Sequence, residues 1–308
     1  MRKNKVTFRH RVEYTAFIAF ICMVKVSPLF LVHFIKKMLG FLGRRISKRH
    51  RGIVGKNLDL AFPDYTEDEK AKLKDAIYEH FSSIFVDIVC LYVKKNPGKI
   101  LKEVEVNNID VFKKTLEKNQ GVILFSAHFG NWELIPFILH RQLNIKPISI
   151  AREMNNPLVE RKVKQFREYM GSTIIYKKNA LRTMLKKLEQ NRVVYLLIDQ
   201  NAIRREAVFV DFFGQTASAV PSVSQLHLKK NKPVIPLFLH YEKDKIVLDF
   251  LEEILFKGSG ELEKDIQQLT QQCTAVIEKN IRKHPEQWFW FHNRWKTKPP
   301  PGRRNHER

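Results

Sequence analysis

The chain has 308 residues, of which 44% are apolar and 28% charged, so it can fill a sizeable core and is not disordered throughout. Its net charge of +23 suggests nucleic-acid binding, but residues 1–11, 36–56 and 294–308 hold 18 of the 23 excess positive charges. Because the rest of the chain carries only +5, a basic face spread along a nucleic-acid-binding domain is excluded. The three cysteines are far apart and predict neither a disulfide framework nor a zinc site.

An apolar segment at residues 14–35 lies between the first two basic stretches. At about 1.5 Å per residue, a helix of this length reaches roughly the 30 Å of a bilayer core. Lys25 and Pro28 interrupt the segment, and its two basic flanks suit a dip from one side as well as a crossing. We therefore expect residues 1–56 to be a basic-flanked membrane anchor. A cleaved signal peptide and a buried core helix are the alternatives, although no small-x-small cleavage site follows Val24.

The next segment predicts one long amphipathic helix packed on the core. Thr66 and Glu69 have the spacing of a capping box at its start. Apolar residues then recur at helical spacing at Leu73, Ile77, Phe81, Ile84, Phe85 and Ile88.

From residue 104 onward, short β-rich apolar runs alternate with amphipathic ones, which predicts an α/β fold with a single mixed, largely parallel sheet flanked by helices. A charged turn at residues 241–245 between two such runs is the reason for expecting a mixed sheet. We expect residues 57–296 to form this domain and 297–308 to be a basic, frayed tail. The expected strands are residues 122–126, 147–151, 173–176, 193–198, 207–212, 234–240 and 246–250, and the expected helices are 131–142, 156–170, 180–190, 219–230 and 261–283.

The stretch H-F-G-N-W-E begins just past the first of these strands. His128 can accept a proton at neutral pH, and a carboxylate on its other ring nitrogen would fix its tautomer. Glu133, in the first turn of the following helix, is positioned to reach back to it. Asn131 is a candidate N-cap, and Gly130 permits close approach of the backbone to a substrate. These are parts of an acyl-transfer site in which free N–H groups of the helix could stabilise an oxyanion.

Other interpretations of this stretch remain open on spacing alone. A histidine near a turn is commonly structural, and a glutamate is favoured in any first helical turn. Ser126 is the nearest candidate nucleophile but lacks the Gly-x-Ser-x-Gly elbow, so we expect a hydroxyl of the substrate to attack. A zinc site is disfavoured because His128, Glu133 and His140 do not form the H-E-x-x-H pattern.

Several blocks together resemble a known family. H-F-G-N-W-E resembles the H-x-x-x-x-(D/E) motif of glycerolipid-type acyltransferases, and its surroundings resemble the late acyltransferases of lipid A biosynthesis, which include lauroyl and myristoyl transferases. The supporting blocks are A-R-E-M-N-N-P-L at residues 151–158, L-I-D-Q-N at 197–201, V-F-V-D-F-F-G at 208–214 and P-E-Q-W-F-W-F-H-N-R-W-K at 285–296. Residues 218–230 depart from the family pattern, which leaves the acyl pocket and the chain length open.

The resemblance implies His128 as general base and Glu133 as the carboxylate that orients it or positions the substrate. It marks Arg152 and Asp199 as further functional positions. From chemistry alone, Arg152 could clamp a phosphate and Asp199 could orient His128 or accept a sugar hydroxyl, whereas a salt bridge at the sheet edge is the plainer alternative. We expect the tryptophans of the last block to pack in the core.

The resemblance further implies transfer of a fatty acyl group from an acyl-carrier-protein thioester to a hydroxyl of a Kdo-bearing lipid A precursor. We expect direct attack without an acyl-enzyme, no metal and no cofactor. The expected partners are acyl carrier protein and anionic membrane lipids, with no nucleic acid, and the expected location is the inner membrane with the catalytic domain facing the cytoplasm. Acylation of another glycolipid or a lysophospholipid is the alternative reaction, and a non-catalytic membrane-binding protein is the alternative from another class.

Overall fold

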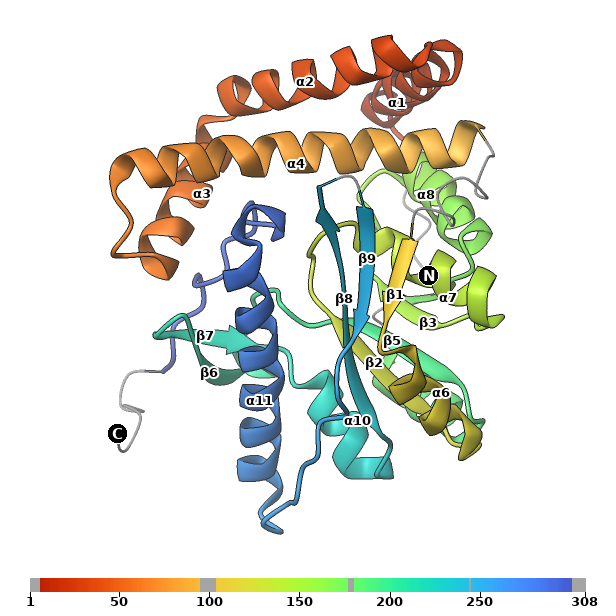
Figure 1. The fold of residues 1–308 in the computed structure, drawn as a ribbon, viewed down its shortest axis with the longest axis vertical. Coiled ribbons are helices and arrows are strands. Elements are labelled where there is room, and N and C mark those ends of the chain that lie inside the picture. Colours follow the sequence, from red (N-terminus) through yellow and green to blue (C-terminus); the bar gives the residue numbers. More distant parts are fainter. Residues whose placement is uncertain (1–5, 95–103, 177–179, 244, 301–308) are drawn as a thin grey trace.

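The computed structural model describes residues 6–94, 104–176, 180–243 and 245–300. Its helices and strands follow the expected alternation along the chain (Figure 1). In chain order they are α1 (Phe8–Val26), α2 (Leu29–Ile46), α3 (Lys48–Ala61), α4 (Glu67–Lys94), β1 (Val104–Asn107), α6 (Ile109–Glu117), β2 (Val122–Ser126), η1 (Trp132–Leu134), α7 (Ile135–Leu143), β3 (Ile148–Ala151), α8 (Pro157–Tyr169), β4 (Thr173–Tyr176), α9 (Ala180–Glu189), β5 (Val193–Leu197), η2 (Arg204–Glu206), β6 (Val208–Phe212), β7 (Gln215–Ala219), α10 (Ser222–Lys230), β8 (Val234–Glu242), β9 (Lys245–Phe250), α11 (Leu262–Lys283) and η3 (Pro285–Gln287).

The main sheet has seven strands in the order β1-β9-β8-β2-β5-β3-β4. All neighbouring pairs are parallel except β8 and β9, which form an antiparallel hairpin. The prediction of a mixed, largely parallel sheet flanked by helices is therefore confirmed. The strand expected at residues 207–212 does form, but it pairs with β7 in a separate two-stranded sheet. β1, β7, α3 and α6 were not predicted from the sequence.

Alternate residues of β2 face two different cores. Ile123 and Phe125 belong to a cluster with residues of α9, α10, α11 and the C-terminal block, whereas Val122 and Leu124 belong to a cluster with residues of α6, α7 and α8. Because successive side chains of a strand point to opposite faces, this strand is buried on both sides, which explains its unbroken apolar run.

The apolar segment at residues 14–35 is two helices rather than one. α1 ends at Val26, Ser27 and Pro28 are extended, and α2 begins at Leu29. Since proline lacks an N–H and restricts the preceding residue to extended conformations, it separates the two helices. The segment predicted to span or dip therefore does not form a straight span. The predicted domain boundary at residue 56 lies inside α3.

α4 crosses the end of the sheet, with α1 and α2 on its far side (Figure 1). Within the described residues, one helix is long and apolar enough to cross a membrane, and it is α4 over Glu67–Val93. A third of its apolar window is buried, and core helices share these properties, so this is weak support for an N-terminal anchor.

The predicted start of α4 is confirmed, but its apolar stripe is only partly buried. The Thr66 N–H donates to Glu69 at 2.8 Å, and the Glu69 N–H donates to the Thr66 hydroxyl at 3.3 Å, which makes the capping box. Phe85 was expected in the core but is 47% exposed. Its ring stacks on Phe20 of α1 and lines a cavity instead of packing on the sheet.

Candidate active site

Three neighbouring parallel strands end at one edge of the sheet. Ser126 of β2 pairs with Leu197 of β5, and β5 pairs with β3. His128 and Asp199 lie two residues past β2 and β5, and Arg152 lies one residue past β3. The sheet thus places these three residues at the edge where active sites of open α/β sheets are found.

Asp199 receives three hydrogen bonds. His128 donates to it twice, from its backbone N–H at 3.0 Å and from Nδ1 at 2.8 Å, and the indole Nε1 of Trp288 donates at 2.8 Å. Burial raises the pKa of Asp199, but the electrostatic interaction with the His128 imidazole and these hydrogen bonds outweigh it, so the pKa lies below its ordinary value. Asp199 is therefore a carboxylate that accepts a hydrogen bond from the Nδ1–H of His128.

This hydrogen bond defines the free nitrogen of the imidazole. With Nδ1 protonated, Nε2 of the neutral ring carries a lone pair. The side-chain amide of Gln200 lies 3.3 Å from Nε2 and donates to it. The His128 side chain is 21% exposed, whereas that of Asp199 is 2% exposed. The nitrogen that carries the lone pair therefore faces the Gln200 amide, on a ring that is partly exposed.

Aromatic residues surround His128. The rings of Trp132 and Phe289 lie 5.1 and 6.2 Å from its imidazole. The C-terminal block reaches this site through an antiparallel bridge between Phe129 and Trp288. Trp288 is 1% exposed, and Trp290 and Trp295 are also buried, so the expected packing is confirmed.

Glu133 does not contact His128 through a hydrogen bond. Its carboxylate instead accepts from the guanidinium of Arg167 on α8, from Nε at 3.0 and 3.2 Å and from a terminal nitrogen at 2.5 Å. Burial lowers the pKa of Arg167, but the charge of Glu133 outweighs it, so the pKa is raised. The Asp199 carboxylate, and not that of Glu133, therefore binds the His128 imidazole. Glu133 lies beside two cavities instead.

Two cavities meet at Glu133. One of about 130 Å³ is almost wholly apolar and lies between α1, α4 and α8, lined by Phe17, Ile21, Phe85, Ile88, Val89, Tyr92, Glu133, Lys162, Val163 and Phe166. The other, of about 50 Å³, lies beneath Trp132 and includes Glu133 and Arg167 in its lining. Glu133 thus forms a polar end of the apolar recess, and its partner Arg167 lines the smaller cavity next to it.

Gly130 and Asn131 stabilise the loop after β2. The Gly130 N–H and the Asn131 side-chain amide bind other parts of the protein and are not free to bind a ligand. Gly130 has a φ of 53°, and a Cβ there would collide with the carbonyl of Leu239. Its N–H donates to the Gln287 carbonyl at 2.8 Å and so is not available to an oxyanion. The expected side-chain cap by Asn131 is absent at η1, and its amide donates to the Tyr241 hydroxyl at 3.3 Å instead. The close approach predicted for Gly130 is therefore to β8.

The sequence profile of bacterial lipid A biosynthesis acyltransferases matches residues 1–297, which is nearly the whole chain. The chain belongs to this family. It is therefore an acyltransferase, as the resemblance implied, and three of the blocks that carried the resemblance meet where His128, Asp199 and Trp288 contact one another.

Curated relatives agree with this assignment. A lipid A biosynthesis palmitoleoyltransferase of Escherichia coli K12 is 26% identical over 277 residues, covering 88% of this chain and 87% of the relative. The lipid A biosynthesis myristoyltransferase of the same strain is 23% identical over 299 residues, covering 96% and 90%. The corresponding lauroyltransferase is 26% identical over 265 residues, covering 85% and 84%.

Three residues of the acyltransferase site were not predicted as such. Gln200 lies inside the quoted Asp-Gln pair, and Trp288 lies inside the C-terminal block but was assigned to packing alone. Arg167 had no signal beyond its place on a predicted helix, because its ion pair with Glu133 joins residues 34 positions apart. Ser126, the candidate nucleophile, is completely buried, which disfavours its attack on a substrate.

Proposed function

We propose that this enzyme transfers a fatty acyl group from an acyl-carrier-protein thioester to a hydroxyl of a Kdo-bearing lipid A precursor. The observation that carries the mechanism is the 2.8 Å hydrogen bond from His128 Nδ1 to the buried Asp199. It holds the imidazole in the tautomer whose Nε2 can accept a proton. His128 is the general base in this proposal, and Asp199 orients it and stabilises the imidazolium.

The reaction proceeds by direct attack. His128 Nε2 takes the proton of the substrate hydroxyl while its oxygen bonds to the thioester carbonyl carbon. The resulting tetrahedral intermediate collapses, the carbon–sulfur bond breaks, and the imidazolium returns the proton to the thiolate. Atoms and charge balance without an acyl-enzyme. For the hydroxyl to reach Nε2, the Gln200 amide has to leave its present position or donate to the incoming oxygen.

The residues around this base position the substrates. The apolar recess ending at Glu133 takes an acyl chain, because its lining offers contact with methylene groups and almost no hydrogen-bonding partner. Glu133 closes one end of the recess, and the Arg167 guanidinium fixes the position of its carboxylate. Arg152, exposed at the same sheet edge, is suited to an anionic group of the lipid precursor.

The enzyme acts at the cytoplasmic surface of the inner membrane in this proposal. α1 and α2 expose large apolar side chains, including Phe8, Leu29, Phe30 and Phe34, which are 61–82% exposed. Residues 36–56 add eight Lys and Arg and no acid. Apolar side chains next to basic ones favour insertion among anionic headgroups, at about 1 kcal/mol per basic residue near the surface. The same basic surface would attract an acidic carrier protein.

The decisive experiment combines purified enzyme in detergent, acyl-carrier-protein thioester and the tetra-acylated precursor, with the product identified by mass spectrometry. We expect wild-type enzyme to add one acyl chain and His128→Ala to lose about 10²–10⁴-fold in rate. Ser126→Ala is the matched control for a neighbouring side chain and should stay near the wild-type rate.

Two outcomes contradict the proposal at different points. A His128→Ala enzyme that works at the wild-type rate refutes the role of the base. An acyl group found on the protein after incubation with the thioester alone, by intact-protein mass spectrometry, refutes direct attack but keeps acyl transfer.

A further inference from the structure

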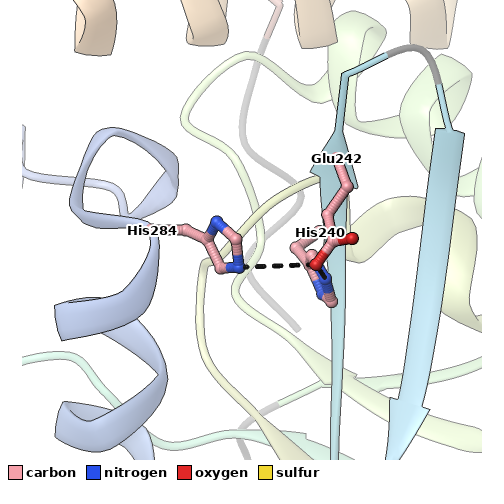
Figure 2. A group of neighbouring side chains, drawn as sticks. All are labelled: His240, Glu242 and His284. Atoms are coloured by element: carbon pink, nitrogen blue, oxygen red, sulfur yellow. Dashed lines mark hydrogen bonds and ion pairs between the residues drawn. The ribbon is translucent and has the colours of Figure 1, made fainter.

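Two histidines and a glutamate gather on the opposite side of β8 from the acyl recess. His240 and Glu242 belong to the end of β8, and His284 follows α11 (Figure 2). Within the described residues, this is the group of His, Cys, Asp or Glu side chains whose ligand atoms lie within 4.8 Å of one another. The mechanism proposed above uses none of the three.

The three donor atoms converge. His240 Nε2 lies 3.0 Å from Glu242 Oε1, and His284 Nε2 lies 4.0 Å from the same oxygen. Figure 2 shows the Glu242 carboxylate beside the His240 ring, with the His284 ring facing both. The two rings are stacked, with their centroids 4.7 Å apart and an interplanar angle of 22°. Tetrahedral zinc with ligands at about 2.0–2.1 Å separates neighbouring donor atoms by about 3.3 Å, a value between the two distances seen here. A small rotation of the His284 ring would bring it into range.

A second carboxylate supports the ligand role of His240. Its Nδ1 lies 3.6 Å from Asp249 Oδ2 on β9, and the other oxygen of Asp249 accepts from Asn107 at 2.9 Å. Histidines that bind metal through one ring nitrogen usually present the other to a carboxylate, which fixes the tautomer. His240 therefore directs Nε2 toward the cluster while Nδ1 faces Asp249.

Burial and charge fit a divalent cation. The His240 side chain is 7% exposed, whereas those of His284 and Glu242 are 26% and 58% exposed, so a fourth position is open to water. Two neutral imidazoles and one carboxylate form a donor set typical of zinc.

We propose that His240, Glu242 and His284 bind a zinc-like divalent cation that joins β8 to the segment after α11. That segment continues to Gln287, which exchanges hydrogen bonds of 2.8 and 2.9 Å with Tyr241, and then to Trp288 at the active site. The cation is structural and holds the C-terminal block against β8. The expectation of no metal concerned the acyl-transfer chemistry, which this structural cation leaves unaffected.

The test is zinc titration of metal-free, tag-free full-length enzyme in detergent by calorimetry. We expect one saturable site in the wild type and at least 10-fold weaker binding in Glu242→Gln and His284→Ala. Asp249→Asn should weaken binding about 10–100-fold through loss of the outer carboxylate. His50→Ala, which removes an exposed histidine of α3, is the matched control and should bind as the wild type does.

Thermal unfolding provides a second readout that does not depend on activity. Zinc should raise the Tm of the wild type but not that of Glu242→Gln, since only a cation bound to the native state stabilises it. Because Glu242 is exposed, this variant should match the fold of the wild type without metal, as checked by circular dichroism. Absence of a saturable site in the wild type, or equal binding by wild type and His284→Ala, overturns the proposal.

Discussion

Asp199 shows how a single buried carboxylate organises the site. Removing a charge from water is costly, yet the pKa of Asp199 is below the ordinary value because the electrostatic interaction with the His128 imidazole and three hydrogen bonds stabilise the ionised form. Two of those donors belong to His128, and the third belongs to Trp288. The same carboxylate therefore fixes the ring, the loop that bears it and the C-terminal block.

Replacing Asp199 with Asn should lower kcat by about 10²–10⁴-fold and change KM little, because an amide no longer stabilises the imidazolium or selects its tautomer. Steady-state kinetics with acyl-carrier thioester would measure both constants. Glu133→Gln is the informative comparison, since it leaves the His128 contact intact and should affect KM more than Asp199→Asn does. A kcat within threefold of wild type for Asp199→Asn would show that His128 needs no orienting carboxylate.

His80 predicts a pH dependence of stability. Burial lowers its pKa to about 4, and its ring packs edge-on against Phe81 and Tyr241 at 5.1 and 5.7 Å. The unfolded chain, with an ordinary histidine pKa near 6.5, binds this proton more readily than the native state does. Burial of the neutral His80 ring therefore makes its full contribution to the free energy of unfolding above about pH 6.5. As the pH falls toward 4 this contribution is lost, and the loss reaches about 2 kcal/mol at pH 5.

His80→Phe keeps a ring of similar shape and removes the titration. Denaturant unfolding measures how much unfolding free energy each protein loses between pH 7 and pH 5. This loss should be about 2 kcal/mol smaller for His80→Phe than for the wild type. His50→Phe, at an exposed position, is the control. An equal loss in wild type and His80→Phe would assign the pH dependence to other groups.

Among the structural elements, three helices decide the shape of the apolar recess. α1 and α4 supply aromatic and aliphatic side chains, and α8 supplies Val163, Phe166 and Arg167, the partner of Glu133. Because α8 carries both recess-lining side chains and the partner of Glu133, a change in its side chains would alter the depth available to an acyl chain without touching His128.

Val163→Phe should fill part of this cavity of about 130 Å³. We expect kcat/KM for the longest accepted acyl donor to fall at least 10-fold relative to that for a donor several methylenes shorter, since each displaced methylene loses about 0.8 kcal/mol of burial. A competition between two acyl-carrier thioesters, read by mass spectrometry, measures the ratio directly. Lys230→Phe on distant α10 is the control, and an unchanged ratio for Val163→Phe would exclude this recess as the acyl site.

For the whole molecule, α1 and α2 form the outermost layer, separated from the sheet by α4 (Figure 1). Phe30 and Phe34 are 77% and 61% exposed on α2. Exposed aromatic side chains beside a basic stretch support the membrane contact that we propose for this layer.

The double variant Phe30→Ser/Phe34→Ser should weaken binding to vesicles containing anionic phospholipid by about 10–100-fold, because two aromatic rings no longer leave water. Co-sedimentation measures the bound fraction. Leu255→Ser is the matched control, because Leu255 is 84% exposed but lies in the connection before α11. Equal binding by the double variant and the wild type would refute membrane contact through α2.

The sequence by itself determined the fold class, most of the strands and helices between residues 122 and 283, and the place of His128 just past a strand, because apolar periodicity and short motifs are local properties of the chain. Val122–Ser126 and Thr173–Tyr176 form strands at the predicted residues. Only the tertiary structure decided which strands pair, and Val208–Phe212 pairs outside the main sheet. It also decided which carboxylate reaches the imidazole. Glu133 is five residues from His128 and turns to Arg167, while Asp199 is 71 residues away and makes the contact. Pairing of β2 with β5 creates that proximity, and it depends on contacts between distant segments that no local pattern records.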